Sequence, residues 1–475
     1  MHVPLIKRRG RPQDGAPKVV VVGAGFAGFH TLRRLERLLA PDQAVLGLIA
    51  PTDYLLYSPL LPEVATGVLD PRDLAVSLRQ SLRRTVPVFG HVTDIDFPAR
   101  TLTVLGRDQQ IRVQGWDRLV LAPGSVTREF DIPGVAEHAR GLKTVEEATF
   151  LRNHILAQLD LADTIPDTAD RRSKRRELLT VVAVGAGYTG TELVAQMQHW
   201  MHGIADRWST FGPDDVRWLL IDIAPHVLPE LGERLGDHAM KVLRGRGVEI
   251  RLGVTVANAT ESSVTLTDGD VIPTRTLIWG AGIAPSPLIA QLGLPTSKGR
   301  LIVNDDLSVP DLEHVWALGD AAAVTDLTKP AVEGEERPVA APTAQHAQRQ
   351  GRAVARNIAA TLGIGEARSY KHNDLGLVAD LGGWQGVAKT LGLPLSGPVA
   401  KFVARAYHLY ALPSTAAKVR VTTNWMFDLV LPSRVVQLNT IKFQDARIAN
   451  AQSTGIYREH PVLVDSEMKG TTNGG

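Results

Sequence analysis

The sequence predicts an α/β protein built from two doubly wound parallel-sheet domains, with an α+β region at its C-terminal end. Three observations support this class. An apolar run enters a glycine-rich turn and then a helix-forming segment at Val19–Leu35, "VVVVGAGFAGFHTLRRL". The same arrangement returns 162 residues further along, at Val181–Met197, "VVAVGAGYTGTELVAQM". With 475 residues, the chain is also long enough for two or three domains.

The composition narrows the classes of protein that remain. The chain has no cysteine, which excludes disulfides, thiolate metal sites and cysteine-dependent redox chemistry, and fits a reducing compartment. A formal net charge of +2 gives no indication of nucleic-acid binding. No run of about 18 apolar residues is present, so no transmembrane helix is expected. Residues 1–17 lack the apolar segment of a secretory signal and are expected to form a flexible arm, and residues 466–475 a disordered tail.

The first unit is expected to begin with a strand at Lys18. Its glycine turn opens a helix through about Leu39, and a second strand, "AVLGLIA", ends near Ala50. Short strands follow in "VPVFGHVTDIDFPARTLTVL", and "WDRLVLAPGS" is a buried strand that closes on a Pro-Gly turn. This order is the start of a βαβ unit.

The second unit repeats the design after a basic stretch, "TADRRSKRRELL", which is expected to be a solvated helix or linker. The strand and turn "LLTVVAVGAGYTG" precede a helix and the strand "VRWLLIDI". Further strands are expected in "TRTLIWGAGIAPSPL" and "RLIVNDDLSVPDLEHVWALGDAAAV". From about Tyr370 the pattern becomes mixed α+β, with scattered aromatic residues among Lys and Arg.

The glycine positions predict that each unit is a Rossmann-like dinucleotide-binding domain. Gly23 permits the tight turn, Gly25 leaves the helix N-terminus open to a pyrophosphate, and Gly28 lets helix and strand pack closely. The same reasons apply to Gly185, Gly187 and Gly190. One such motif is a weak indication, but two, each after an apolar strand and before a helix, favour two dinucleotides. One unit is expected to hold FAD and the other NADH.

An acid at the end of the second strand of each unit would hold an adenosine ribose. In the second unit Asp222 stands there, 32 residues beyond Gly190, with "HWMHGIADRWSTFGPDD" as an insert that explains the long spacing. An acid repels a 2′-phosphate, so Asp222 favours NADH over NADPH; the alternative is a strand-end Asp that faces solvent. The first unit has Ala50 at this place; either Asp53, three residues later, takes the role of the acid, or the ribose hydroxyl is left to water.

The order of motifs resembles that of the type II NADH:quinone oxidoreductases, flavoproteins with two dinucleotide-binding domains. The glycine-rich motifs resemble that family's FAD and NADH motifs, and "DYLLYSPLLPEVATG", "GHVTDID" and "WDRLVLAPGS" lie between them in the family's order. "LIWGAGI", "VWALGDAAAV" and the helix "PTAQHAQRQG" follow. Ferredoxin and disulfide reductases share single motifs, but the ordered set with the last helix is specific. The resemblance extends from about Val19 to Leu438, with Pro123 where Thr is usual.

The resemblance implies a domain plan and a set of cofactor contacts. An FAD-binding domain would comprise residues 18–140 and 300–369, an NADH-binding domain residues 141–299, and a membrane- or quinone-associated region residues 370–465. Asp320 would bind the FAD ribityl chain, although an Asp there also suits a helix N-cap. The implied cofactor-binding residues are Gly23, Gly25, Phe26, Ala27, Gly28, Val92, Ala122, Gly124, Gly319, Asp320, Gly185, Gly187, Gly190, Asp222 and Gly282.

Three residues are implied to be catalytic: Glu192, Gln345 and Arg349. Glu192 would lie near the nicotinamide and quinone and deliver protons, although an acid in a first helical turn is also favoured by the helix dipole. Gln345 would border the quinone, or it is ordinary helix surface. Arg349 stands where the family has a second Gln, and it offers only donors and a charge. His346 is expected to be structural.

The segment from Pro398 to Phe443 combines basic and aromatic residues, which suits an anionic membrane surface or a small docking subdomain. Its one acid is Asp428. The basic residues are Lys401, Arg405, Lys418, Arg420, Arg434 and Lys442, and between them lie Phe402, Tyr407, Tyr410, Trp425, Met426 and Phe427. The family resemblance favours a monotopic membrane anchor.

The resemblance thus implies an FAD-dependent respiratory-chain enzyme that passes a hydride from NADH to FAD and two electrons to a membrane quinone, without proton pumping. Its expected partners are NADH, the quinone, the membrane surface and, in a homodimer, a second copy of the chain, at the cytoplasmic face of the cell membrane as a peripheral protein. Two alternatives remain: a reductase of a soluble electron carrier, and a non-catalytic nucleotide-binding redox sensor. Ala50 and Arg349 favour the second.

Overall fold

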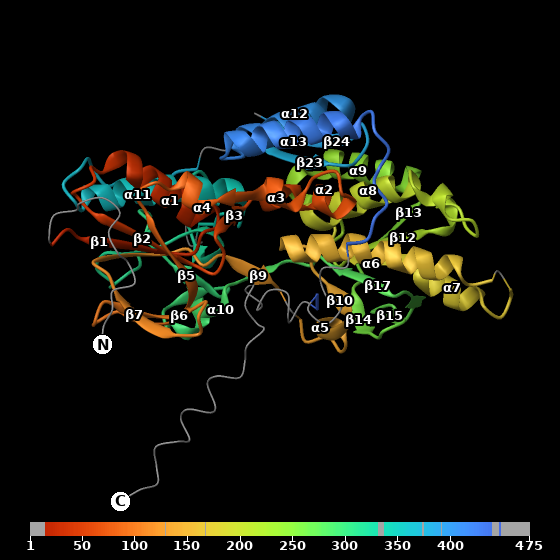
Figure 1. The fold of residues 1–475 in the computed structure, drawn as a ribbon, viewed down its shortest axis with the longest axis horizontal. Helices are drawn as coiled ribbons and strands as arrows, with labels where there is room; N and C mark the ends of the chain where they lie inside the picture. The colour runs from red at the N-terminus through yellow and green to blue at the C-terminus, as the bar shows by residue number, and fades with distance from the viewer. Residues whose placement is uncertain are drawn as a thin grey trace, which may run out of the picture.

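The computed structural model describes residues 15–128, 130–166, 168–330, 337–372, 375–390, 392–438 and 446–447. The predicted tail at residues 466–475 and nearly all of the predicted N-terminal arm lie outside these ranges. Two sheets, the first mixed and the second parallel throughout, lie side by side with helices packed on them, and a pair of C-terminal helices crosses above them (Figure 1). The predicted α/β class with a C-terminal α+β region is confirmed.

The first sheet has seven strands, and β1 (Lys18–Val22) lies at its centre. Their order is β21 (Val315–Ala317), β8 (Arg118–Leu121), β1, β2 (Val45–Ala50), β5 (Val86–Asp96), β6 (Thr101–Gly106) and β7 (Ile111–Gly115). Strand β1 is parallel to both neighbours, with Val20 opposite Gly47 and Leu119. The chain continues from β1 to β2 on one side, whereas the neighbour on the other side, β8, comes later in the sequence. The carboxyl end of β1 is therefore a topological switch point, where such sheets bind ligands.

Two helices lie over one face of the first sheet (Figure 1). Helix α1 (Phe26–Leu38) follows the glycine turn, as predicted, and α11 (Ala344–Ala360) packs against it. A side chain at Gly351 of α11 would collide with the Ala27 carbonyl oxygen of α1, so a glycine is needed for this close contact. The segment that resembles the quinone-site helix is therefore fixed directly to the helix behind the first glycine turn.

The second sheet has five strands around β11 (Thr180–Val184). Their order is β10 (Ala139–Arg140), β17 (Thr276–Trp279), β11, β12 (Arg217–Asp222) and β13 (Val248–Leu252), and all pairs are parallel. Helix α8 (Tyr188–His202) follows the second glycine turn. The predicted insert before β12 contains two short 3₁₀ turns, η2 (Ala205–Arg207) and η3 (Pro213–Asp215). The repeated design is thus present, with its long spacing explained by the insert.

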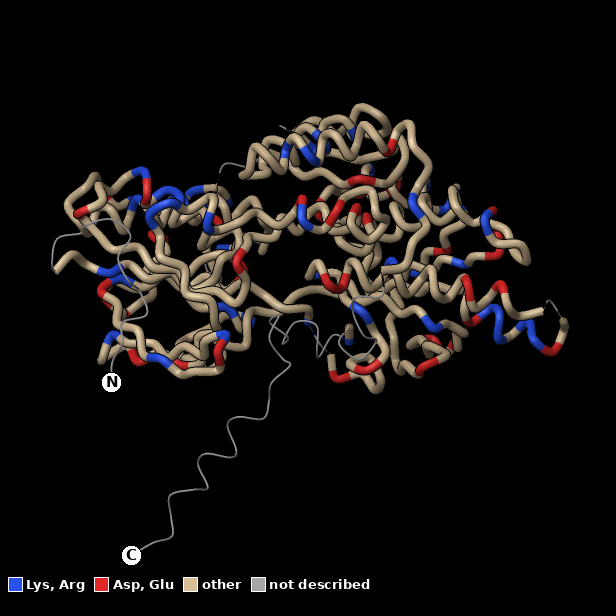
Figure 2. Tube along the Cα trace, viewed as in Figure 1, with Lys and Arg blue, Asp and Glu red and all other residues tan. Residues whose placement is uncertain are grey.

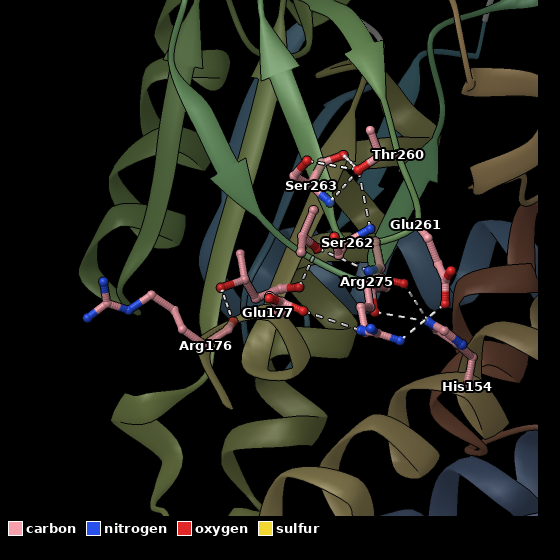
Figure 3. Close-up of polar contacts among 11 residues, drawn as sticks. His154, Arg176, Glu177, Thr260, Glu261, Ser262, Ser263 and Arg275 are labelled. Carbon is pink, nitrogen blue, oxygen red and sulfur yellow. Dashed lines mark hydrogen bonds and ion pairs between the residues drawn. The ribbon is translucent and has the colours of Figure 1, made fainter. Parts of the chain in front are cut away.

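A polar cluster lies at the amino ends of the strands of the second sheet (Figure 3). Arg275, just before β17, contacts Glu177 at the end of α7 (Arg172–Leu179) and Glu261, with nitrogen–oxygen distances of 3.5 and 3.3 Å. The Arg275 carbonyl oxygen lies 3.1 Å from Nε2 of His154 on α6 (Val145–Asp163). These contacts lie at the amino ends of the parallel strands, and they leave the carboxyl ends to the glycine turns.

The chain crosses between the units on two adjacent strands. Strand β9 (Ser125–Thr127) leaves the first sheet, and β18 (Ile283–Pro285) returns from the second. They pair antiparallel, with Val126 opposite Ala284 (Figure 1). This double crossing agrees with the predicted discontinuous first domain, whose boundaries stay a prediction.

The C-terminal region is α+β. A three-stranded antiparallel sheet of β23 (Leu377–Asp380), β24 (Gly386–Thr390) and β25 (Leu393–Ser396) leads into α12 (Gly397–Ala411) and α13 (Thr415–Asp428). Pro413 interrupts the helical path, and Ser414 caps α13 by accepting a 3.3 Å hydrogen bond from the Ala417 N–H. In Figure 1 the two helices lie above α2 (Leu61–Thr66) and α8. Among the described residues, no helix is both long and apolar enough to cross a bilayer.

Smaller elements complete the fold. They are β3 (Tyr54–Leu56), η1 (Ser58–Leu60), α3 (Pro71–Leu74), β4 (Ala75–Ser77), α4 (Leu78–Ser81), α5 (Val135–His138), η4 (Pro229–Leu231), α9 (Glu233–Gly245), β14 (Val256–Ala259), β15 (Ser263–Leu266), β16 (Val271–Pro273), α10 (Pro287–Gln291), β19 (Thr296–Ser297), β20 (Arg300–Ile302), η5 (Gly319–Ala321) and β22 (Ala322–Ala323). One large apolar core connects both units and the C-terminal helices, from Val19 to Trp425. A second, smaller core fills the space between the second sheet and the β14–β16 sheet.

Candidate active site

The first glycine turn contains three glycines, and the small size of each has a different structural consequence. Gly23 has a φ of +99°, and a Cβ there would collide with the Ala122 carbonyl oxygen. A Cβ on Gly28 would collide with the Gly23 carbonyl oxygen. A Cβ on Gly25 would meet no protein atom within 4 Å, and Gly25 caps α1 without any side-chain hydrogen bond. The protein itself does not require Gly25, so the open helix N-terminus fits a pyrophosphate.

The second turn has the same geometry. Gly185 has a φ of +108°, and a Cβ on Gly190 would collide with the Gly185 carbonyl oxygen. Gly187 caps α8, and a Cβ there would again meet nothing within 4 Å. Asp222 lies beside this turn: its Oδ2 accepts a 2.5 Å hydrogen bond from the Ala186 N–H, and its Oδ1 accepts from the Ala224 N–H at 2.7 Å. The carboxylate thus faces the turn instead of standing free in solvent.

The corresponding end of β2 differs from that of β12. Ala50 is buried, 1% exposed, and Asp53 lies in an exposed turn where its carbonyl oxygen accepts a 3.0 Å hydrogen bond from the Leu78 N–H. Arg107 donates to the Pro51 carbonyl oxygen at 3.2 Å, and its guanidinium lies 4.5 Å from the centre of the Phe89 ring. The first turn therefore has a cation stacked on an aromatic ring near the place where the second turn has an acid.

Asp320 joins the strand crossing to the first sheet. The Ser125 hydroxyl of β9 donates to its Oδ2 at 2.5 Å, and Lys143 Nζ donates to that hydroxyl at 2.7 Å and lies 3.9 Å from the same carboxylate oxygen. Burial lowers the pKa of Lys143. Asp320 lies inside η5, whose N-cap is Leu318, so the alternative role of Asp320 as an N-cap is wrong. Lys143 and Ser125 were not among the predicted site residues, because only the fold brings them to Asp320.

The α11 N-terminus brings Gln345 and Arg349 together. Arg349 Nη1 donates to Gln345 Oε1 at 2.6 Å and to His372 Nε2 at 3.1 Å. Gln345 Nε2 donates to the Gly376 carbonyl oxygen at 2.8 Å, so both side chains bind the segment that leads into β23. His346, expected to be structural, stacks on His372 with ring centres 3.6 Å apart. One turn further, Gln350 accepts a 2.7 Å hydrogen bond from the Gly319 N–H, a contact that the sequence did not reveal.

Glu192 lies at the junction of α8 and the C-terminal region. Its Oε1 accepts a 2.7 Å hydrogen bond from the Asp380 N–H of β23. Protein surrounds the carboxylate, although the residue keeps some exposed area, and this burial raises the pKa of Glu192 to about 8. Asp380 forms an ion pair with Lys401 of α12, and these two residues are 5% and 6% exposed. A carboxyl group in this setting can hold and release a proton near neutral pH.

The C-terminal prediction needs one correction. Lys401 and Trp425 were counted among the residues that would suit a membrane surface, but both are buried, because Lys401 pairs with Asp380 and the Trp425 indole donates to Glu63. The same helices and the chain after α13 do expose apolar side chains. These form what we call the apolar helix face: Val399, Phe402, Tyr410, Val419, Met426, Phe427, Leu429, Val430 and Leu431.

Comparisons with known proteins agree with this architecture. The model of the pyridine nucleotide-disulphide oxidoreductase family matches residues 17–351. The chain is 30% identical to the type II NADH:quinone oxidoreductase of Staphylococcus aureus (strain NCTC 8325 / PS 47) over 395 residues, which cover 82% of this chain and 93% of that protein.

Two solved structures are similar in fold. NDH2 from Plasmodium falciparum, in complex with NADH, has a TM-score of 0.80 at 18% identity and covers 88% of this chain and 99% of its own. The sulfide:quinone oxidoreductase of Aquifex aeolicus has a TM-score of 0.64 at 18% identity, covering 88% and 96%. At these identities the likeness concerns the fold alone.

Proposed function

Because the chain belongs to the pyridine nucleotide-disulphide oxidoreductase family and, within it, to the type II NADH:quinone oxidoreductases, we propose which of its residues carry out each part of that reaction. The protein is an FAD-dependent enzyme that transfers electrons from NADH to a quinone without pumping protons. The overall reaction converts NADH, one proton and a quinone to NAD⁺ and a quinol. The chain must therefore bind two dinucleotides and supply one proton from water.

The two open glycine positions support the assignment of the nucleotides. Gly25 at the α1 N-terminus binds the FAD pyrophosphate, and Gly187 at the α8 N-terminus binds that of NADH. Asp222 binds the adenosine ribose of NADH, because its carboxylate lies on the second turn. Asp320 orients the FAD ribityl chain, with Ser125 and Lys143 holding its carboxylate. FAD held by these residues would supply the redox chemistry between NADH and the quinone.

The side chains beyond the flavin site bind the quinone and manage its protons. Gln345 and Arg349 form one hydrogen-bonded pair, so Arg349 acts on the quinone together with Gln345. Glu192 is the proton donor: the Asp380 N–H orients its carboxyl group, and burial keeps it protonated at neutral pH. The observation that carries this proposal is the contact of Glu192 with Asp380 of the buried Asp380–Lys401 pair, in a fold with two open glycine turns.

The apolar helix face supports our proposal that the enzyme binds to a membrane surface. Nine exposed apolar side chains on α12, α13 and the residues after them would otherwise remain in water, and a lipid-soluble quinone has to be reached from a bilayer. Figure 2 shows Lys and Arg on α12, α13 and the neighbouring α1 and α11 segments. Such charges favour an anionic lipid surface. We place this surface on the cytoplasmic side, where NADH is formed.

An anaerobic absorbance titration tests the reaction. The purified protein is expected to show a flavin spectrum, to bleach when NADH is added, and to recover its colour with a short-chain quinone. Recovery only with a soluble carrier protein would replace the quinone by that carrier. A protein without flavin, or one that does not bleach, would contradict the enzymatic function and leave the two turns as a nucleotide-binding scaffold.

A further inference from the structure

A buried group of ionisable side chains joins α2 to the C-terminal helices. Glu63 of α2 is 3% exposed, and its Oε2 accepts a 2.5 Å hydrogen bond from Trp425 Nε1 of α13, which is 5% exposed. Helix α2 packs directly against α8, which carries Glu192. Glu63 interacts electrostatically with Glu192 and with the Asp380–Lys401 pair. Helices α8, α12 and α13 and strand β23 therefore meet around the Glu63 carboxyl group of α2.

The charges in this group do not balance. Three carboxyl groups, those of Glu63, Glu192 and Asp380, share the space with one buried ammonium group, that of Lys401. Ionising all three would leave negative charge uncompensated where little water can reach it. Burial, followed by the charge of Asp380, accordingly raises the pKa of Glu63. Burial also raises the pKa of Glu192, and the charges of Asp380 and then of Glu63 add to that effect.

The other groups around Glu63 are cations or hydrogen-bond donors. From α12, Arg405 stacks on the Trp425 ring at 4.8 Å from its centre and lowers the pKa of Glu63 slightly against the effect of burial. From α6, Arg152 donates to the Thr66 carbonyl oxygen at the end of α2. The Trp425 indole hydrogen bond favours the ionised form of Glu63. Trp425 thus adds to the effect of Lys401 and increases the negative charge that Glu63 carries.

We infer that Glu63 is a positioning residue for Glu192: its carboxylate, held by the Trp425 indole, keeps a proton on the Glu192 carboxyl group until the quinone takes it. The inference rests on the proposed role of Glu192. NADH supplies a hydride, which brings two electrons and one hydrogen. Glu192 gives the second proton to a quinone oxygen, becomes a carboxylate and is reprotonated from water. Repulsion by Glu63 makes that carboxylate basic enough to regain its proton at neutral pH.

The pH dependence of quinone reduction tests the inference. Holoenzyme that has been reduced with NADH is mixed with a short-chain quinone, and the rate of flavin reoxidation is followed across pH. Because Glu192 acts in its protonated form, the rate falls as pH rises through its pKa. Glu63→Gln removes the repulsive charge and keeps an acceptor for Trp425, so this alkaline limb should move down by about one pH unit. The rate of bleaching by NADH should stay unchanged.

Two further variants vary the charge of Glu63 in graded steps. Trp425→Phe removes the donor that stabilises ionised Glu63, so the limb should move in the same direction by a smaller amount. Glu63→Asp keeps the charge and should restore a limb close to that of the wild type. Asp73→Asn is the matched control: Asn424 of α13 donates to Asp73 of α3 at 2.7 Å, a similar contact of the same helix that is not coupled to Glu192, and its limb should not move.

The outcomes separate this inference from the proposed function. If Glu192→Gln slows quinone reduction but neither Glu63→Gln nor Trp425→Phe moves the limb, Glu63 does not act on Glu192. If Glu192→Gln leaves both the rate and the limb unchanged, the proposed role of Glu192 is wrong, and the inference is wrong with it. A shift in Asp73→Asn as large as that in Trp425→Phe would show that helix position, and not charge, sets the limb. If Glu63→Gln fails to fold, Trp425→Phe decides.

Discussion

At the scale of single residues, the glycines of each turn are not equivalent. Gly23 and Gly28 are required by the fold, because added Cβ atoms would collide with backbone oxygens of the same protein. Gly25 and Gly187 have open space where a Cβ would be, so only a bound molecule could require their small size. Substitutions at these two positions can therefore separate ligand binding from folding.

Reciprocal alanine variants should assign one nucleotide to each turn. Gly25→Ala should fold normally and be purified with at least about tenfold weaker FAD binding, since a methyl group would displace the pyrophosphate from the helix N-terminus. Gly187→Ala should keep its flavin but raise the KM for NADH by a similar factor. Flavin content and steady-state kinetics measure these effects, and circular dichroism checks the fold. The opposite pattern would exchange the two nucleotides.

Asp222 should determine the choice between NADH and NADPH. Asp222→Ala removes a carboxylate that would repel the 2′-phosphate, so the ratio of kcat/KM for NADPH to that for NADH should rise about tenfold. Asp222→Asn controls for the lost hydrogen bonds, because it can still accept one from the Ala186 N–H. Both variants should raise the ratio. An unchanged ratio in both would show that the carboxylate only caps the turn.

At the scale of elements, α12 and α13 have two different sides. Their inner sides hold Lys401, His408 and Trp425 in the core, whereas the apolar helix face is exposed. On the inner side, the Tyr57 hydroxyl lies 3.1 Å from His408 Nδ1. Burial at this contact raises the pKa of Tyr57. Deleting the chain from Pro398 would therefore remove both a membrane surface and the partners of Glu63 and Asp380. Surface substitutions are the cleaner test.

Charges on the apolar helix face should release the protein from membranes. The variant Phe402→Asp with Met426→Asp should lower the partition into vesicles of anionic and zwitterionic lipids by at least about tenfold, since each side chain contributes roughly 1–2 kcal/mol on insertion. Flotation of the vesicles measures the bound fraction. Ile111→Asp with Val271→Asp is the matched control, because these side chains are 70% and 60% exposed on the β7 and β16 strands. Unchanged binding, with a protein twice the expected size in solution, would make this face a dimer contact instead.

At the scale of the whole molecule, one apolar core and one buried ionisable group connect the two nucleotide units with the C-terminal region. Glu63 lies between β2 and β5 of the first sheet in sequence, Glu192 lies on α8 of the second unit, and Asp380 and Lys401 come from the C-terminal region. The stability of this junction must depend on pH, because the raised pKa values of Glu63 and Glu192 mean that these two carboxyl groups hold protons more tightly in the folded state than in the unfolded chain.

The sign of this dependence follows from Glu192. Its pKa rises from 4.5 to about 8 on folding, so its contribution to stability is complete below pH 4.5 and is lost as pH rises through 8. Glu192→Gln has no such loss. The Tm of the variant minus that of the wild type should therefore be roughly 3 °C greater at pH 9 than at pH 5, which corresponds to about 3 kcal/mol for a chain of 475 residues. Differential scanning calorimetry measures it; a difference independent of pH would place Glu192 in water in the folded protein.

Much of this molecule could be predicted from the sequence because the relevant signals are local. Apolar strands that enter GxGxxG turns fix their own conformation, since Gly23 and Gly185 need positive φ angles and the following helices need close packing. The end of β12 at Asp222 and the beginning of a helix after Pro342 and Thr343 are local in the same way. The two parallel-sheet units, the α+β region and the family were therefore evident before the structure.

Only the tertiary structure decided which side chains meet in the active site. Glu63 and Trp425 are 362 residues apart, and Lys143 reaches Asp320 across the strands that join the two units. The sequence assigned Lys401 and Trp425 to a membrane surface, because the type of a basic or aromatic residue in a helix does not indicate whether its side chain is buried or exposed. The buried side is decided only in the folded protein, where Asp380 accepts a hydrogen bond from Lys401 and Glu63 accepts one from Trp425. Local conformation depends on residues that are neighbours in the sequence, whereas burial and charge pairing depend on residues that are far apart in the sequence and meet only in the folded protein.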